Sequence, residues 1–78
     1  MSTYHLDAKR LLCPMPVIKV QNKVNELSPG DVLEVVCTDP GALNDVPAWC
    51  RINGHKVIAT RQADDLVTIT LEVGSDDN

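Results

Sequence analysis

The sequence predicts an α+β domain, a two-layer α/β sandwich in which two helices cover one face of a mixed four-stranded sheet. Its length of 78 residues suits one domain, spanning residues 1–78, and leaves no room for a second. Its apolar pattern changes along the chain in the order β-α-β-α-β-β. A helix between the first two strands makes them parallel, whereas a short connection makes the last two strands antiparallel.

Residues 4–8 alternate weakly between apolar and polar, which predicts a short first strand. A helix is expected to begin at Pro14, because a proline in the first turn loses no intrahelical hydrogen bond. Its buried stripe is predicted from apolar residues spaced three and four apart: Val17, Val20, Val24 and Leu27. The Ser-Pro-Gly sequence at 28–30 ends this helix.

Residues 31–37 are mostly apolar and rich in valine, which predicts a central strand. The second helix is expected to open at Asp39, a good cap that is followed by a proline. Pro47 should interrupt this helix, since proline cannot donate the backbone hydrogen bond. We therefore expect one short turn, a restart capped near Asp45, and a stop at Gly54.

The last part of the chain predicts two antiparallel strands over residues 56–61 and 66–73, and the second alternates plainly between polar and apolar residues. Residues 63–65, Ala-Asp-Asp, form the expected hairpin connection. Residues 74–78 are polar and acidic, so we expect a flexible tail there.

Composition excludes several classes of protein. No apolar run approaches the roughly 20 residues that cross a bilayer, and the first residues do not resemble a signal peptide. Three cysteines form no disulfide framework, which predicts reduced thiols in the cytoplasm. One Trp, one Tyr and no Phe argue against base stacking, so no direct contact with nucleic acid is expected. His5 and His55 have no partner at metal-ligand spacing, so we expect no metal site.

Positive charge is concentrated near the start of the first helix. The net charge is −4, yet no acidic residue occurs between Ala8 and Asn25. That window contains four basic residues: Lys9, Arg10, Lys19 and Lys23. They could be a chance cluster on a solvated helix face, or a field that stabilises a thiolate and attracts an acidic partner.

Cys13 is the candidate reactive residue, because it lies at the predicted cap of the first helix. A helix N-terminus presents unpaired N–H groups and partial positive charge, which favour a thiolate. Pro14 and Pro16 fix the backbone around it. The basic residues predicted to support it are Lys9, Arg10 and Lys19. The alternative is that Cys13 is a small buried hydrophobic residue.

The stretch 12–16, Leu-Cys-Pro-Met-Pro, resembles the Cys-Pro-x-Pro motif of the TusA/SirA family of sulfur-carrier proteins. Residues 38–40 and 45–50 resemble a second block of that family, and the similarity runs from about residue 6 to 73. The resemblance implies the same βαβαββ fold. It also implies that Cys13 accepts a sulfane sulfur as a persulfide, with Pro14 and Pro16 as structural prolines.

In that family the sulfur comes from a cysteine desulfurase or another persulfide donor and passes to a downstream acceptor protein. The resemblance therefore implies a sulfurtransferase-type carrier rather than a stand-alone enzyme, with no cofactor beyond the covalent sulfur on Cys13. Destinations implied by the family are tRNA thiolation, sulfur supply to the molybdenum cofactor, and sulfur oxidation. We expect the free protein to be a monomer.

Further residues could serve this function, and each has an alternative interpretation. Met15 and Ile18 fall beside the buried stripe, so together with Lys23 they could form a partner-docking surface or be scattered surface residues. Cys37 ends the second strand on the same sheet edge as Cys13 and is a possible second thiol, or a buried strand residue. Cys50 is expected in the core.

Two other functions stay open. The chain could be a non-catalytic regulatory or RNA-binding module that uses the basic patch, because small sheets of this shape also occur in RNA-binding domains. It could also be a redox or selenium carrier that uses Cys13 for a different cargo. Replacing Cys13 by Ser separates the first alternative from the carrier, since only the carrier needs the thiol.

Overall fold

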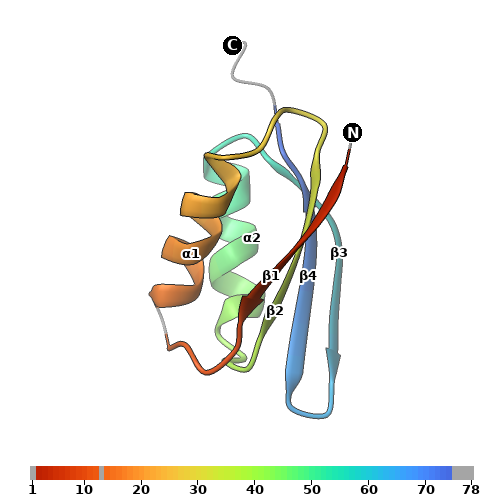
Figure 1. Ribbon diagram of the computed structural model, residues 1–78. Coiled ribbons are helices and arrows are strands. Elements are labelled where there is room, and N and C mark those ends of the chain that lie inside the picture. Colours follow the sequence, from red (N-terminus) through yellow and green to blue (C-terminus); the bar gives the residue numbers. More distant parts are fainter. Residues whose placement is uncertain (1, 13, 75–78) are drawn as a thin grey trace.

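The computed structural model describes residues 2–12 and 14–74. Its elements, in chain order, are β1 (Thr3–Ala8), α1 (Met15–Val24), β2 (Val32–Cys37), α2 (Ala42–Ile52), β3 (Lys56–Ala63) and β4 (Leu66–Glu72). Both helices lie on the same face of the sheet (Figure 1). The predicted order of elements and the two-layer α+β arrangement are confirmed.

The four strands form one mixed sheet in the order β1-β2-β4-β3. β1 and β2 are parallel, with Ala8 opposite Cys37, and β4 pairs antiparallel with both β2 and β3. The carboxyl ends of β1 and β2 therefore lie at one edge of the sheet. The β1–α1 and β2–α2 loops meet there (Figure 1).

The core lies between the sheet and the two helices. Alternate residues of β2 and β4 are buried toward the helices: Leu33, Val35, Cys37, Val67, Ile69 and Leu71. The helices bury Pro16, Val20 and Val24 from α1, and Ala42, Val46 and Cys50 from α2. Of the predicted α1 stripe, Val20 and Val24 are buried, and Val17 and Leu27 are partly buried against the core. Pro16 is buried as well, and Leu27 lies beyond the end of α1 at Val24.

The expected interruption of the second helix at Pro47 is wrong. α2 is a continuous helix with Pro47 inside it. Pro47 lacks the N–H that would otherwise bond to the Leu43 carbonyl, which weakens the helix at this point. On either side of it, Val46 and Cys50 are fully buried. Their burial stabilises the helical path more than one backbone hydrogen bond does.

The helix starts also differ from the expectation. α1 begins at Met15 and its N-cap is Pro14, one residue later than predicted. The N-cap of α2 is Gly41, and its N–H donates to Asp39 Oδ1 at 3.0 Å. The Asp39 side chain therefore caps the turn that precedes the helix, not the helix itself. Asp45 lies inside the first turn of α2 and is not its cap.

The C-terminal hairpin follows the prediction, although β3 extends to Ala63, two residues further than expected. Asp64 forms the turn with a φ of 57°, a conformation that Asp adopts more readily than most residues. Of the predicted tail, the structure describes Gly74, and residues 75–78 lie outside the described residues.

Candidate functional site

The predicted centre of the site, Cys13, lies outside the described residues. The structure does describe the residues on both sides of it. Leu12 is 76% exposed and Pro14 is also exposed. Both belong to the connection between β1 and α1, at the sheet edge where β2 also ends (Figure 1). Leu12 and Pro14 are therefore accessible to a partner protein.

The start of α1 has no acidic side chain and no capping side chain. The Met15 N–H donates to the Leu12 carbonyl at 2.8 Å, and the Ile18 N–H donates to the Pro14 carbonyl at 3.2 Å. Pro14 offers no capping side chain, and the first turn of α1 contains no acidic residue. The partial positive charge of this helix end is thus not opposed by a carboxylate within the helix.

Hydrogen bonds from three elements hold the loop that precedes Cys13. The Lys9 N–H donates to Asp7 Oδ1 at 2.9 Å, which closes a tight turn at the end of β1. Lys19 Nζ, from α1, donates to the Asp7 carbonyl oxygen at 2.7 Å. The Arg10 N–H donates to Thr38 Oγ1 at 2.9 Å, immediately after β2. Arg10 itself has a φ of 67°, in the left-handed region.

Asp7 and Thr38 are site residues that the sequence analysis missed. Together with Lys9 and Arg10 they line an open hollow of about 420 Å³ at this edge. The spacing of Asp7 two residues before Lys9 is the local signal of an Asx turn. Thr38 could be found from the parallel pairing, because it follows Cys37, the register partner of Ala8.

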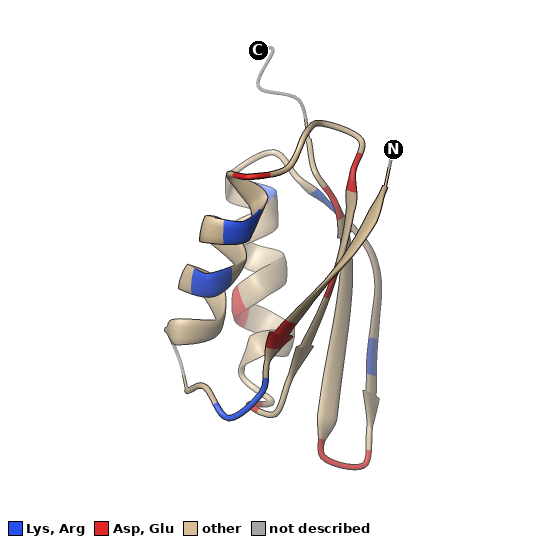
Figure 2. Cartoon of the chain, in the orientation of Figure 1, with Lys and Arg blue, Asp and Glu red and all other residues tan. Residues whose placement is uncertain are grey.

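The basic residues lie in the loop after β1 and along α1 (Figure 2). Lys9 and Arg10 lie in the loop, bonded to Asp7 and Thr38, and Lys19 reaches the Asp7 carbonyl from α1. Lys23 lies in the last turn, which places it about 12 Å along the axis from Met15. Its ammonium group is 5.6 Å from the Tyr4 ring centroid and 3.6 Å from Glu26 Oε1. Lys23 therefore lies one helical turn beyond Lys19 and further from Lys9 and Arg10 in the loop.

Exposed apolar side chains lie at the same end of α1. Met15 is 47% exposed and Ile18 is 41% exposed, so their predicted exposure is confirmed. They are three residues apart and therefore share one helix face. Leu12, which the sequence analysis did not single out, adds a third exposed apolar side chain. We call these three residues, Leu12, Met15 and Ile18, the apolar surface of α1, and its role in docking stays a prediction.

Cys37 and Cys50 are both fully buried. Burial raises the pKa of the Cys37 thiol, and the nearby charge of Asp39 raises it further. Burial alone raises the pKa of Cys50 to about 11. Both thiols are therefore protonated and shielded at neutral pH, which agrees with Cys50 in the core and with the buried-residue interpretation of Cys37.

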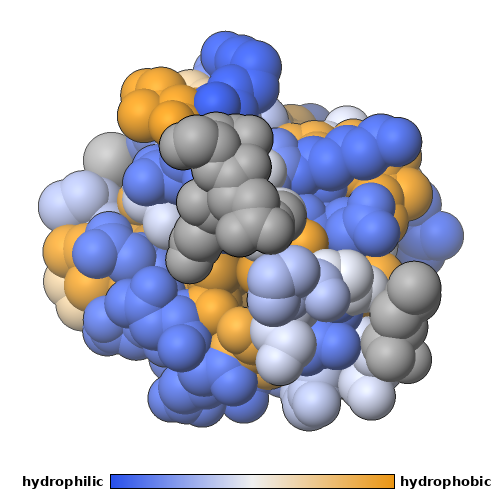
Figure 3. All heavy atoms as spheres, turned by 90° about the horizontal axis from the view of Figure 1, so that it is seen from above, coloured by the Kyte–Doolittle hydropathy of each residue, from blue (hydrophilic) through white to orange (hydrophobic). Residues whose placement is uncertain are grey.

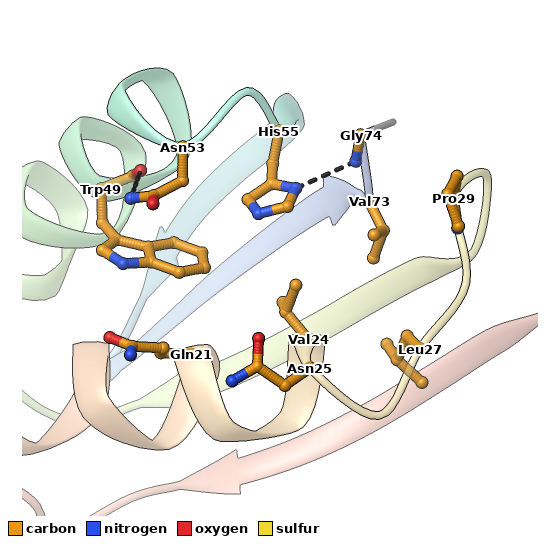
Figure 4. Close-up of a pocket in the computed structure, with 10 residues that line it drawn as sticks. All are labelled: Gln21, Val24, Asn25, Leu27, Pro29, Trp49, Asn53, His55, Val73 and Gly74. Carbon is orange, nitrogen blue, oxygen red and sulfur yellow. Dashed lines mark hydrogen bonds between the residues drawn. The ribbon is translucent and has the colours of Figure 1, made fainter. Parts of the chain in front are cut away.

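A second hollow, of about 310 Å³, lies at the other end of the domain, between the C-terminal ends of the helices (Figure 4). The rings of Trp49 and His55 stack there with centroids 5.1 Å apart. His55 Nδ1 accepts the Gly74 N–H at 2.9 Å. Viewed from this end, hydrophilic side chains surround apolar atoms near the centre (Figure 3). None of the predicted site residues lines this hollow.

Within residues 2–12 and 14–74, no three His, Cys, Asp or Glu side chains gather in a way that could hold a metal ion. No helix in the same part of the chain is long and apolar enough to cross a membrane.

Comparisons with known proteins agree with one another. The family model described as "Sulfurtransferase TusA" matches residues 4–73. The putative sulfur carrier protein YrkI of Bacillus subtilis is 41% identical over 69 residues, which cover 88% of this chain and 92% of that protein. The sulfur carrier protein TusA of Pseudomonas aeruginosa is 42% identical over 57 residues, 73% of this chain and 72% of that protein.

A solved structure also supports the fold. The crystal structure of a SirA-like protein from Desulfitobacterium hafniense matches with a TM-score of 0.79, covering 92% of this chain and 99% of that one. Its sequence identity is 20%, so it supports the fold alone. The sequence matches supply the family. The chain belongs to the TusA family of sulfurtransferases and sulfur carriers.

Proposed function

We propose that the chain is a sulfur carrier that accepts a sulfane sulfur on Cys13 and passes it on as a persulfide. The family supports a carrier role. The observation that supports Cys13 as its site is the exposure of Leu12 and Pro14 on either side, at a helix start without acidic residues. Such surroundings favour a thiolate and leave room for a partner to approach.

The proposed chemistry is an exchange between a thiolate and a persulfide. The Cys13 thiolate attacks the outer sulfur of the donor's persulfide. The new S–S bond forms as the donor's S–S bond breaks, and the electron pair leaves with the donor's thiolate. In the second step an acceptor thiolate attacks the outer sulfur of the Cys13 persulfide, and Cys13 is released as a thiolate. No net oxidation occurs, so the exchange needs no cofactor.

The donor we propose is a cysteine desulfurase or another persulfide-bearing protein, and the acceptor is a downstream protein with a thiolate. Both would dock on the apolar surface of α1, where adaptable methionine suits more than one partner. Lys9 and Arg10, in the loop before it, would favour a partner with an acidic rim. We propose that this exchange takes place in the cytoplasm, where thiols stay reduced, and that it supplies tRNA thiolation, molybdenum-cofactor assembly or sulfur oxidation.

The proposal is tested by incubating the protein with a cysteine desulfurase and cysteine, then measuring its intact mass. We expect a gain of one sulfur atom that a reductant removes. The gain should disappear in the Cys13→Ser variant and persist in the matched Cys37→Ser variant. A gain that persists in Cys13→Ser, or no gain in the wild type, would contradict the proposal.

The same experiment addresses the regulatory or RNA-binding alternative, which predicts a function that survives Cys13→Ser. The structure gives this alternative less support than the charge pattern did. Lys19 is engaged with the Asp7 carbonyl, and Lys23 with Tyr4 and Glu26. Two of the four basic residues therefore already interact within the domain, and a nucleic-acid footprint needs a larger basic surface.

A further inference from the structure

The conformation of Arg10 is unusual for its position. Its φ of 67° lies in the left-handed region, where residues other than glycine are uncommon and asparagine and aspartate are preferred. Arginine has no short side chain that bonds locally to the backbone. Such a conformation persists when its surroundings hold it, and residues of this kind cluster at functional sites.

The contact that holds Arg10 comes from Thr38, the residue directly after β2. Its N–H donates to Thr38 Oγ1 at 2.9 Å, across 28 residues of sequence. Thr38 directly follows Cys37, which pairs with Ala8, the last residue of β1. The Thr38 hydroxyl is therefore fixed to the sheet at the level where the β1–α1 loop begins.

The neighbouring contacts leave a distinct role for Thr38. The bonds from Lys9 and Lys19 both end on Asp7, so they hold the start of the loop at β1. The bond from Arg10 acts one residue further along and ties the loop to β2. Beyond Arg10 the chain runs through Leu11 and Leu12 to Cys13.

We propose that Thr38 is a positioning residue for sulfur transfer, because its hydroxyl holds Arg10 in the left-handed conformation that directs the loop toward Cys13. This inference rests on the proposed function of Cys13. Without the hydroxyl, the Arg10 N–H loses its acceptor and the backbone relaxes to a negative φ. The relaxed loop moves Lys9 and Arg10 within the segment that leads to Cys13, and small displacements of reacting groups lower rates strongly.

The test measures the reactivity of Cys13 with iodoacetamide across the pH range from about 5 to about 9, where a cysteine thiol titrates. Trypsin releases Cys13 in the peptide of residues 11–19, separate from Cys37 and Cys50. Thr38→Val removes the hydroxyl and keeps the shape, whereas Thr38→Ser keeps the hydroxyl. We expect Thr38→Val to shift the pH profile and to slow sulfur loading about tenfold, while Thr38→Ser retains both.

A double-mutant cycle separates positioning from a general loss of stability. Arg10→Gly adopts a positive φ without strain, so the Thr38 hydroxyl should matter less in that background. We expect Thr38→Val to have a smaller effect on the pH profile in Arg10→Gly than in the wild type. An equal effect in both backgrounds would overturn the inference, and so would a Thr38→Val protein that folds and keeps the wild-type profile.

The alkylation measurement also distinguishes the role of Thr38 from the carrier function of Cys13. Alkylation reports the state of the Cys13 thiol without any sulfur donor. A shifted alkylation profile with no sulfur loading in the wild type would contradict the carrier function and leave the effect of Thr38 on the thiol standing. An unchanged profile with normal loading would overturn the role of Thr38 alone.

Discussion

A hydrogen bond between His55 and Gly74 joins the segment just after β4 to the turn after α2. His55 Nδ1 accepts the Gly74 N–H at 2.9 Å, and the imidazole stacks on the indole of Trp49 (Figure 4). A Cβ at Gly74 would overlap the carbonyl oxygen of Gly54. Two backbone segments are therefore in direct contact at this end of the domain, and glycine alone fits between them.

Replacing Gly74 by Ala should lower the free energy of unfolding by about 1–3 kcal/mol, because the new methyl group cannot fit without a backbone shift. Urea unfolding measures the change. Gly54 is the matched control, since its φ of 81° is unfavourable for alanine although a Cβ there has open space. Asn tolerates a positive φ, so Gly54→Asn should cost less than Gly54→Ala. If Gly74→Asn were also milder than Gly74→Ala, the cost would not be steric.

The stability of the fold should depend on pH through the carboxylate of Asp31. Its carboxylate, which is nearly buried, accepts the Ser28 N–H at 2.9 Å and the Ser2 N–H at 3.2 Å. The bond from Ser28 lowers the pKa of Asp31 most, and the bond from Ser2 lowers it further. A lowered pKa means that the stabilisation is complete above the unfolded-state value of about 3.9 and is lost as the pH falls through the folded-state value.

We therefore expect Asp31→Asn to be less stable than the wild type at about pH 6, with the difference shrinking toward about pH 2. Urea unfolding at several pH values measures this difference. Asp65→Asn removes the same charge at the exposed hairpin turn and serves as the control. A difference between Asp31→Asn and the wild type that stays constant with pH would contradict the role of the carboxylate.

The topology was predictable because it depends on patterns that are local in sequence. The alternation over residues 66–73 and the apolar run over 31–37 each identify a strand without any long-range information. The path of α2 through Pro47 was not predictable in this way. Tertiary burial of Val46 and Cys50 outweighs the local preference of proline, and local patterns do not contain that burial.

At the candidate site, too, local features were predictable and long-range contacts were not. The exposure of Met15 and Ile18 follows from their helical phase, which the sequence contains. The contact between Thr38 and Arg10 depends on the register between β1 and β2, and a single sequence does not specify which residues a loop will meet. The positive φ of Arg10 was missed for the same reason, because arginine has no local preference for it.

The two buried cysteines should be unreactive in the folded protein. With a pKa of about 11, Cys50 is a thiolate in about a thousandth of molecules at pH 8, and the raised pKa of Cys37 acts in the same direction. We expect iodoacetamide to label the tryptic peptide of residues 24–51, which carries both, only after unfolding in urea.

Mild oxidation extends this prediction. Because Cys37 is fully buried, we expect it to form no disulfide with Cys13 while the domain stays folded. Intact mass spectrometry under non-reducing conditions measures this. A cross-link between residues 13 and 37 in the folded protein would show that β2 opens at its end, and it would make Cys37 a second functional thiol.

The apolar surface of α1 gives a direct test of docking. Replacing Met15 and Ile18 by Ser should slow sulfur loading from a desulfurase, because truncating a central interface side chain costs about 1 kcal/mol or more, roughly fivefold in rate for each residue. Both side chains are exposed, so the fold should keep its stability. Ile58 is the matched control: it is 52% exposed but lies on β3, the edge strand opposite β1. Loading by Ile58→Ser should match the wild type, and an equal loss in all three variants would show that partners do not select α1.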